Sequence, residues 1–375
     1  MRVKLGEVAT YVNGYAFKPS DWSGKGRPII RIQDLTGNSY QANRYEGDCD
    51  PKYNVYAGDV LISWSASLGV YVWDGEEAVL NQHIFKVVFD KAEVDKSFFI
   101  HQVERILNNA SNEAHGATMK HLTKPVFDAL PFNLPAIEEQ RKIAAVLDKV
   151  SGLIAMRKKQ LQKLDDLVKS RFVEMFGTIR DNQFGCEIKT LQDVCEQIKD
   201  GTHQTPTYTE DNINGYKFLS SKDVTTGKID WTHLKYIPEE LHNELYARIA
   251  PKKGDILLAK NGTTGIAAIV DKDEIFDIYV SLALLRPVEI NSVYLWAAIN
   301  SVETKQQFDS SLKGIGVPNL HLSEIKKARI IVPPMKAQEQ FAAFFEQTDK
   351  SKLTIQQSLD KLELLKKSMM QKYFG

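Results

Sequence analysis

The sequence predicts an α+β protein in which two unlike globular modules are each followed by a long helix, the two helices pairing antiparallel as a coiled coil. Three observations predict this fold. One segment is repeated, apolar residues recur at heptad spacing inside that segment, and short β-rich runs lie outside it. At 375 residues the chain is also long enough for two or three domains, each with its own core.

The repeat joins residues 116–177 to residues 314–375 without a gap, at a constant shift of 198 positions. Its identical pairs include Gly116 with Gly314, Leu122 with Leu320, Pro135 with Pro333, Gln140 with Gln338, Leu161 with Leu359, Leu164 with Leu362, and Gly177 with Gly375. Upstream the halves agree only in outline, as in Gly58-Asp59-Val60-Leu61 and Gly254-Asp255-Ile256-Leu257. Each half is therefore a variable module followed by a similar one, which gives the chain a pseudo-twofold repeat.

Two long helices are predicted in the similar segments, at 136–177 and 334–375, because Pro135 and Pro333 mark helix entries. Apolar residues then recur at heptad spacing, at Ile143, Leu147, Val150, Ile154, Leu161, Leu164 and Val168, and at Phe341, Phe345, Ile355, Leu359, Leu362 and Met369. About forty residues make a rod of roughly 60 Å. Such a stripe needs a partner helix, and the other copy, packed antiparallel, would place the variable modules at opposite ends.

The helix ends carry two further expectations. Phe176-Gly177 and Phe374-Gly375 are typical helix stops. Phe172, Phe176, Met370 and Phe374 are candidates for an outward face that a partner protein covers.

Module 1 (residues 1–135) and module 2 (residues 178–333) alternate β-rich runs with turn residues. Strands are expected at 28–32, 60–63, 70–73 and 84–89, and at 217–219, 255–259, 266–270 and 280–285. Each module also has one helical segment, at 97–109 and at 292–308. Small α+β modules follow from this mixture.

Composition limits the function. Apolar residues make up 43% of the chain and charged ones 26%, which is ordinary for a globular protein, and no apolar window is long enough to span a membrane. The N-terminus lacks the apolar core of a signal peptide, so a soluble intracellular protein is expected. Cys49, Cys186 and Cys195 are too few for a disulfide framework and are expected to be reduced. With 48 basic and 48 acidic residues there is no global field toward nucleic acid, so DNA contacts must come from local patches or a partner.

Catalytic motifs are missing from the sequence. It has no phosphate-binding glycine loop, no dinucleotide fingerprint and no Asn-Pro-Pro-aromatic loop of an amino-methyltransferase. Nuclease-like Glu-x-Lys triplets occur at 187–189 and 324–326, but chance alone supplies one or two in a chain of this composition. The eight histidines are scattered without metal-ligand spacing. The chain is therefore expected to be non-catalytic and to hold no metal.

In its architecture the chain resembles the specificity (S) subunit of Type I restriction-modification systems, the HsdS family. The resemblance covers nearly all 375 residues. It depends on two variable modules, each closed by a Gly-to-Leu segment at 116–122 and 314–320 and followed by a proline-led heptad helix. The most telling pieces are 135–140 with 143–148, their counterpart 333–338, and the Gly-Asp-Val/Ile-Leu runs at 58 and 254.

The resemblance implies two target-recognition domains, 1–135 and 178–333, held apart by spacer helices 136–177 and 334–375. Such a subunit recognises a bipartite double-stranded DNA target with unread base pairs between its halves and takes part in phage defence in the cytoplasm. Two modification subunits would bind the helices and methylate adenine N6 with S-adenosylmethionine, and two restriction subunits could add ATP- and Mg-dependent translocation and cleavage. The chain itself would need no cofactor.

Candidate DNA-contacting residues lie in loops and carry side chains that read base edges or bind phosphate. In module 1 they are Tyr15, Lys18, Arg31, Gln33, Ser65, Asn81, Gln82 and Lys120. In module 2 they are His203, Gln204, Ser221, Lys222, Lys260, Asn261, Thr263 and Asn319. Lys260 and Asn261 rank first because Gly262 allows close backbone approach to a phosphate, whereas Trp64 is assigned to the core.

Two rival interpretations stay open. The chain could be a bipartite DNA-binding or scaffold protein without a methyltransferase, which a neighbouring reading frame containing Asn-Pro-Pro-Tyr or Asn-Pro-Pro-Phe would exclude. It could also be a stand-alone nuclease built on one Glu-x-Lys triplet. Metal-dependent cleavage that is lost on substitution of Lys189 or Lys326 would establish that alternative.

Overall fold

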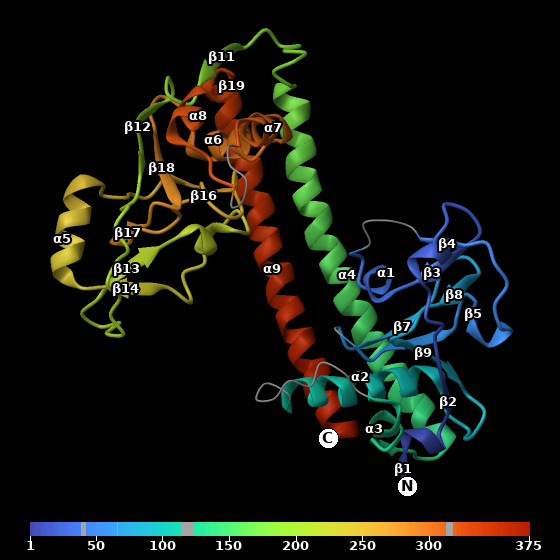
Figure 1. The fold of residues 1–375 in the computed structure, drawn as a ribbon. Coiled ribbons are helices and arrows are strands. Elements are labelled where there is room, and N and C mark those ends of the chain that lie inside the picture. The colour runs from blue at the N-terminus through green and yellow to red at the C-terminus, as the bar shows by residue number, and fades with distance from the viewer. Residues whose placement is uncertain (39–42, 66, 114–122, 313–317) are drawn as a thin grey trace. The chain divides into compact units, whose positions relative to one another are not determined.

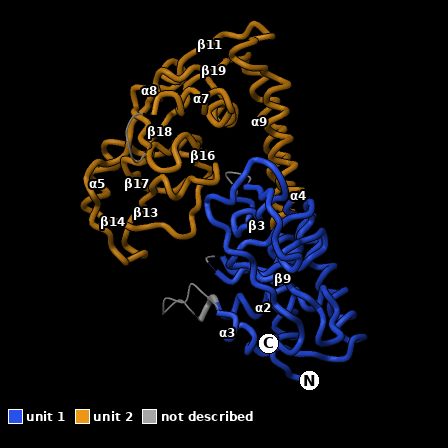
Figure 2. Tube along the Cα trace, turned by 45° about the vertical axis from the view of Figure 1, so that its right-hand side comes forward, with its two compact units in different colours: residues 1–158, 357–375 blue, residues 159–356 orange. Residues whose placement is uncertain are grey.

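The computed structural model describes residues 1–38, 43–65, 67–113, 123–312 and 318–375 (Figure 1). They form two compact units, coloured blue and orange in Figure 2. Unit 1 comprises Met1–Lys158 and Gln357–Gly375, and unit 2 comprises Lys159–Gln356. Each unit thus combines one module with parts of both repeated segments.

Two 40-residue helices dominate the repeated segments, α4 (Ile137–Phe176) and α9 (Met335–Phe374). Both follow the prolines that predicted them, and each contributes one part to each unit. Helix α4 ends because Gly177 takes a φ of +71°, and its N–H donates to the Val173 carbonyl at 2.8 Å. The two predicted long helices are therefore confirmed.

Within unit 1 the two helices run antiparallel. Lys158 of α4 forms an ion pair with Glu363 of α9 at 2.9 Å. Nearer the start of α4 than Lys158, Ile143 and Leu147 share a core with Met370, which is nearer the end of α9 than Glu363. As one helix advances the other returns, which is the antiparallel pairing that the heptad stripe predicts.

Unit 2 repeats that arrangement with other residues. Asp165 of α4 forms an ion pair with Lys352 of α9. Toward the end of α4, the rings of Phe172 and Phe176 lie 5.5 and 5.7 Å from the ring of Phe341, which is earlier in α9. The two helices are therefore antiparallel in this unit as well.

The expectation that aromatic and methionine side chains at the helix ends face outward to a partner protein is wrong. Phe176 is 1% exposed and Met370 is 6% exposed, while Phe172 and Phe374 pack on the cores of their units. The reason is that each helix end is covered by a helix of a module, so its aromatic stripe is already buried. Large apolar residues that do stay exposed on the two helices include Met156, Leu167, Val173, Leu353, Leu364 and Leu365.

The described residues of module 1 form three small sheets. The central sheet has the order β2 (Thr10–Asn13), β9 (Ile84–Val88), β6 (Val60–Ser63), β7 (Gly69–Val72), all antiparallel. The second has the order β4 (Arg44–Tyr45), β3 (Arg27–Ile30), β8 (Ala78–Leu80), β5 (Asn54–Val55), with β3 and β8 parallel. The third pairs β1 (Arg2–Lys4) with β10 (Pro131–Asn133). Its helices include α1 (Ile32–Leu35), α2 (Lys96–Glu113) and α3 (Lys124–Asp128).

Module 2 has the same plan. Its central sheet has the order β12 (Cys195–Asp200), β18 (Leu282–Pro287), β15 (Ile256–Ala259), β16 (Ala267–Ile269). The second has the order β14 (Lys235–Ile237), β13 (Tyr216–Leu219), β17 (Phe276–Ile278), and the third pairs β11 (Glu187–Thr190) with β19 (Arg329–Val332). Its helices include α5 (Glu239–Arg248), α6 (Ser292–Ile299), α7 (Val302–Ser311) and α8 (Leu322–Lys327).

Alternation along the central strands explains why each module is layered. In β6, Val60 and Ile62 face the core formed with α2 and the long helices, whereas Leu61 faces the second sheet. In β15, Ile256 and Leu258 face the helix side, whereas Leu257 faces the second sheet. Successive strand side chains point to opposite faces, so one fully buried strand supplies both cores.

The predicted strands and helices all recur with small shifts at their ends, except that the helix expected at 292–308 is two helices. Ser301 starts the second one, α7, and its Oγ accepts a hydrogen bond from the Thr304 N–H at 3.3 Å. A serine favours such an N-cap over a helix interior, so the chain breaks there. No helix in the described ranges is long and apolar enough to cross a membrane.

Candidate nucleic-acid interface

One backbone framework brings the predicted loops together in each module. In module 1, the Tyr15 N–H donates to the Leu80 carbonyl at 2.8 Å, and the Gln82 N–H donates to the Tyr15 carbonyl at 2.8 Å. In module 2, the Thr202 N–H donates to the Ile278 carbonyl at 3.1 Å. The loop after the first strand of each central sheet is thereby joined to the end of a strand in the second sheet.

A glycine makes this crossing possible. A Cβ on Gly14 would lie 2.0 Å from the Asn81 carbonyl oxygen, and a Cβ on Gly201 would lie 2.0 Å from the Ile278 carbonyl oxygen. Both contacts are with backbone, which cannot move aside. The similarity of Gly14 and Gly201 in the sequence therefore has a steric cause.

The remaining loops of module 1 also have counterparts in module 2, because equivalent hydrogen bonds hold them. The Arg31 and Ser220 N–H groups donate to the carboxylates of Asp34 and Asp223, at 2.8 and 2.6 Å. The Trp64 N–H donates to the His83 carbonyl at 3.3 Å, and the Lys260 N–H donates to the Ser281 carbonyl at 2.8 Å. Matched positions are Tyr15 with Thr202, Arg31 with Ser220, Trp64 with Lys260, and His83 with Ser281.

In module 1 the framework presents a mixed aromatic and polar set. The ring of Tyr15 is 40% exposed and contacts the rings of Phe17 and Tyr53. Lys18 is exposed, Arg31, Gln33, Asn81 and Gln82 are half-buried, and Ser65 is buried. The Arg31 guanidinium lies 5.8 Å from the Trp22 ring. Lys120 and the segment 116–122 lie outside the described residues.

Trp64 is half-buried and packs against the module core to which it was assigned, and it also borders the loops. Its ring stacks on Phe85 at 5.6 Å and contacts the His83 ring at 5.0 Å. Its Nε1 donates to Asn13 Oδ1 at 3.3 Å. His83 holds a φ of +75°, which a non-glycine residue rarely adopts and which places its ring against the tryptophan.

In module 2 the framework is polar and charged. Lys260 is 5% exposed, and its Nζ lies 3.0 Å from Asp200 Oδ2. His203 Nε2 lies 3.1 Å from the same oxygen, and Arg248 donates to the Asp200 and Gly201 carbonyls at 2.6 and 3.2 Å. Burial alone would raise the pKa of Asp200, but Lys260 above all, together with His203, holds it below its usual range.

The Lys260 ammonium is therefore engaged inside the protein, which differs from the exposed phosphate contact expected of it. The exposed part of its loop is Gly262 and Thr263, with Asn261 half-buried. Gly262 takes a φ of +76° with open space around it, so the backbone there is accessible. Lys260 serves to fix the base of the loop.

The other predicted residues of module 2 surround this network. His203, Gln204 and Lys222 are exposed, and Ser221 is held by a hydrogen bond from its N–H to Ser281 Oγ at 3.0 Å. Asn319 forms a β-bridge with Asn261, and the Leu320 N–H donates to the Lys260 carbonyl at 2.9 Å. The structure thus brings the end of the 314–320 segment to the Lys260 loop, although 313–317 lie outside the described residues.

Sequence reasoning missed three residues of this site. Arg248 and Asp200 belong to the charged network, and Tyr279 is the positional counterpart of Asn81 because the Tyr279 and Asn81 N–H groups make matching bonds to Leu219 and Ile30. Arg248 lies on α5, which has no counterpart helix in the described part of module 1, so no repeat pointed to it. Asp200 directly precedes Gly201, the counterpart of Gly14, and Tyr279 lies at the 198-residue shift of the repeat from Asn81, so both could have been found from the sequence.

A buried pair anchors α5 and so positions Arg248. His242 Nδ1 lies 2.7 Å from Asp277 Oδ2, and the His242 ring stacks on Tyr216 at 3.6 Å. Burial raises the pKa of Asp277 to about 6, and the hydrogen bond from His242 opposes that rise. Because both groups are almost fully buried, the pair is a structural joint between α5 and β17.

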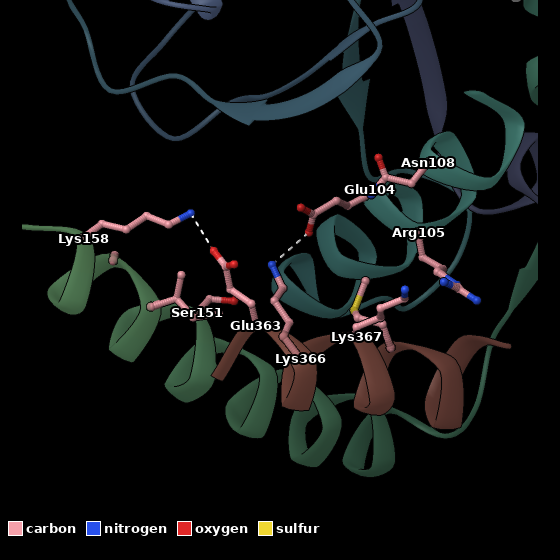
Figure 3. A pocket seen from close by; sticks show the side chains of 11 residues that line it. Glu104, Arg105, Asn108, Ser151, Lys158, Glu363, Lys366 and Lys367 are labelled. Atoms are coloured by element: carbon pink, nitrogen blue, oxygen red, sulfur yellow. Dashed lines mark hydrogen bonds and ion pairs between the residues drawn. The ribbon is translucent and has the colours of Figure 1, made fainter. Parts of the chain in front are cut away.

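A separate cavity of about 430 Å³ lies in unit 1 between α2, α4 and α9 (Figure 3). It is lined by Glu104, Arg105, Asn108, Ser151, Ile154, Ala155, Lys158, Glu363, Lys366, Lys367 and Met370. Two ion pairs cross it, between Lys158 and Glu363 and between Lys366 and Glu104, as the dashed lines in Figure 3 show. Four cations against two carboxylates leave the cavity with a positive excess.

The residues named by the nuclease alternative do not converge. Glu187 pairs with its neighbour Lys189 at 3.1 Å on strand β11, and Glu324 pairs with Lys327 at 3.4 Å on α8. Within the described ranges, no group of three or more His, Cys, Asp or Glu side chains is placed to hold a metal ion. The three cysteines are free thiols.

Comparison with known proteins agrees with the architecture. The family model of the Type I restriction modification DNA specificity domain matches residues 1–166 and 185–364. The chain is 26% identical to the specificity subunit of the Type I restriction enzyme EcoBI of Escherichia coli, over all of this chain and 85% of that protein. It is 24% identical to the MjaVIII specificity subunit of Methanocaldococcus jannaschii, over 98% of this chain and 90% of that protein.

Two solved structures share the fold. The S subunit of a Type I restriction-modification system from M. genitalium superposes with a TM-score of 0.58 at 15% identity, covering 100% of this chain and 96% of that one. A structure described for complex assembly and conformational transition of the type I R-M system gives 0.54 at 16%, covering 100% and 97%. With the family model matched over both halves, the chain belongs to the Type I restriction-modification DNA specificity family.

Proposed function

We propose that this chain is the DNA sequence-specificity subunit of a Type I restriction-modification complex. Module 1 and module 2 each read one half of a bipartite target, and the two long helices set the number of unread base pairs between the halves. One observation carries the proposal: the same hydrogen-bonded loop framework occurs in both modules with different side chains at matched positions. Two unlike readers on one scaffold suit a target with two unlike halves.

The recognition surface in this proposal is the loop framework of each module. In module 1 the exposed or half-buried polar groups of Lys18, Arg31, Asn81 and Gln82 contact DNA. In module 2, His203, Gln204, Lys222, Asn261, Thr263 and Asn319 do so. Base edges in the major groove are read by such donor and acceptor groups, while lysines add phosphate contacts.

The chemistry belongs to partners. Modification subunits, two per complex, methylate adenine N6 with S-adenosylmethionine, and restriction subunits use ATP and Mg for translocation and cleavage. Adenine must leave the helix to be methylated, so this chain needs only to hold the duplex in register. The absence of an Asn-Pro-Pro-aromatic motif from its sequence supports a non-catalytic role. The complex acts in the cytoplasm.

Partner binding also accounts for the charge and the exposed apolar residues. A net charge of zero gives weak attraction to DNA, so the modification subunits supply a share of the phosphate contacts. Leu353 and Leu364 on α9 are 60% and 68% exposed, and Met156 on α4 is 56% exposed. Large exposed apolar side chains on the long helices suit a protein interface, so these helices form the docking surface for the modification subunits.

Methylation-aware sequencing of the host genome tests the proposal. A split adenine motif is expected, and it should disappear when this gene is deleted and return when the gene is restored. An unchanged pattern of adenine methylation after deletion would contradict the proposal and leave a DNA-binding or scaffold protein without a methyltransferase. Metal-dependent cleavage by the purified chain, lost in Lys189→Ala or Lys326→Ala, would favour a nuclease instead.

A further inference from the structure

Gln140 is a buried amide near the start of α4, and it ties three parts of unit 1 together. It is 1% exposed. Its Oε1 accepts a hydrogen bond from the Asp95 N–H at 2.8 Å, and its Nε2 donates to the Pro135 carbonyl at 2.8 Å and to the Glu93 carbonyl at 3.4 Å. One side chain thus connects the long helix, the proline before it and the segment that leads into α2.

Gln338 does the same near the start of α9 in unit 2. It is 2% exposed, accepts from the Asn291 N–H at 2.9 Å and donates to the Pro333 carbonyl at 2.8 Å. The partners are matched pairwise, although modules 1 and 2 share little sequence. An identical buried contact in two otherwise divergent modules indicates a common requirement at these two points.

That requirement concerns the direction of the long helix relative to its own module. Asp95 and Asn291 are the capping residues of α2 and α6, since Asp95 Oδ1 accepts from the Phe98 N–H at 2.9 Å and Asn291 Oδ1 accepts from the Val293 N–H at 2.9 Å. Each glutamine therefore links the first turn of a long helix to the first turn of a module helix. A primary amide offers a donor and an acceptor at one point, which a hydrocarbon or a carboxylate cannot supply there.

We propose that Gln140 and Gln338 are positioning residues that hold each long helix at a fixed angle to its module, so that the complex accepts a single number of unread base pairs. The inference rests on the proposed function. Adding one base pair between the half-sites turns one half relative to the other by about 35° and moves it by about 3.4 Å. Two stiff joints reject that change, whereas two loosened joints accommodate it.

The test uses the complete complex of this chain with its methyltransferase partner and DNA duplexes that carry both half-sites. The spacing is the native one, one base pair shorter or one base pair longer. The double variant Gln140→Met, Gln338→Met keeps the side-chain length but loses all the amide hydrogen bonds. The matched control is Gln162→Met with Gln340→Met, because the Gln162 amide bonds Asp166 within α4 at 3.1 Å and Gln340 is exposed.

We expect the unmodified complex and the control to lose at least about tenfold in affinity on either wrong spacing, the size of one lost base contact. The joint variant should bind all three spacings to within about threefold, with the half-site sequences still required. Gln140→Glu with Gln338→Glu, which retains the acceptor, serves if the methionine variant does not fold. A variant that keeps full spacing selectivity, whatever its melting temperature, overturns the inference. An unmodified complex that ignores one half-site overturns the proposed function instead.

Discussion

Module 1 and module 2 share a sheet plan and a hydrogen-bonded loop framework but carry quite different loop side chains. At matched positions, Tyr15 and Arg31 in module 1 correspond to Thr202 and Ser220 in module 2. The framework that holds these positions is built from main-chain hydrogen bonds and one close-contact glycine per module. Because most of this scaffold is main-chain bonding, loop side chains such as Tyr15 and Arg31 can differ between the modules while the framework is kept, which suits two readers of different half-sites.

Trp64 and Lys260 show how far this difference goes. Trp64 completes an aromatic core, whereas Lys260, on the same framework, holds Asp200 in a charged network with His203. Module 2 also adds α5, whose Arg248 joins that network. The same backbone position is thus supported by apolar packing in one module and by ion pairing in the other.

The largest expected effect is on stability, and it should differ between the C-terminal ends of the two long helices. Phe176 and Phe374 are repeat counterparts, but Phe176 is 1% exposed among Phe172, Tyr294 and Phe341, whereas Phe374 is half-buried against Phe98. Phe176→Ala should lower the free energy of unfolding by about 3–5 kcal/mol, the range for a buried phenylalanine. Phe374→Ala should cost about half as much, because less of the ring leaves the core.

Urea denaturation with hydrogen exchange resolved by segment measures both changes. The unfolding of unit 2 should respond to Phe176→Ala, and that of unit 1 to Phe374→Ala. Equal costs for the two alanines would show that the ends are equivalent after all.

Lys260→Met tests the charged support of module 2. It removes one partner of a buried ion pair, and about 3 kcal/mol of stability should be lost near pH 7. The pKa of Asp200 is below its usual 3.8 in the folded chain, so the stability from this carboxylate exists above that pH and is lost as pH falls through the folded value. The difference in free energy of unfolding between Lys260→Met and the unmodified protein should therefore become smaller below about pH 4.

Denaturation at pH 7 and pH 3.5 gives the comparison. Trp64→Phe, at the matched position of module 1, is the control, and its cost should not depend on pH in this range because it changes no charge. If this difference in free energy of unfolding stays constant down to pH 3.5, Asp200 is not the group through which Lys260 stabilises module 2.

Substitutions in the loops sharpen the comparison at the level of DNA. Gln82→Ala in module 1 and Thr263→Ala in module 2 should each weaken binding by about 1–3 kcal/mol when both half-sites are correct. The two effects should add in the double variant, since the proposed function assigns the two loops to different half-sites. Each should also relax base preference in only one half of the target, which competition with single-base variants of each half-site measures. Loss of preference in both halves from one substitution would contradict separate readers.

The smallest expected effect compares two thiols. Burial raises the pKa of Cys195 in module 2 to about 12, so its thiol stays protonated near pH 8, whereas Cys49 in module 1 is half-buried. Since the thiolate is the reactive form, iodoacetamide should modify Cys49 before Cys195. Mass spectrometry of the labelled peptides checks the order, and modification of Cys195 first would show that module 2 opens more readily than its packing implies.

Much of the fold could be predicted from the sequence because its signals are local and repeated. A proline, a heptad stripe and Gly177 define α4 almost to the residue, and the strands follow from short β-rich runs. The split of the predicted 292–308 helix escaped because Ser301 is an ordinary residue in a helix until its cap is formed. The burial of Phe172 and Met370 escaped for another reason: which face of a helix is covered depends on a module helix distant in the chain.

The candidate site was only partly visible. Its loops could be placed, since strand ends and glycines mark them, and Asn81, Gln82 and Asn261 do lie on the framework. The engagement of Lys260 could not be predicted, because its partner Asp200 is 60 residues earlier and only the folded sheet brings them together. Arg248 lies on a helix that the repeat does not share, so no internal comparison could reveal it.

Lengthening both long helices is the most direct test of whether they set the separation of the half-sites. Four residues inserted after Leu161, with four inserted at the repeat-matched Leu359, add about one helical turn, roughly 6 Å, to each long helix. Methylation-aware sequencing of cells that carry this variant should give the same two half-sites separated by about two more base pairs, at about 3.4 Å each. Altered half-sites with an unchanged separation would contradict the account.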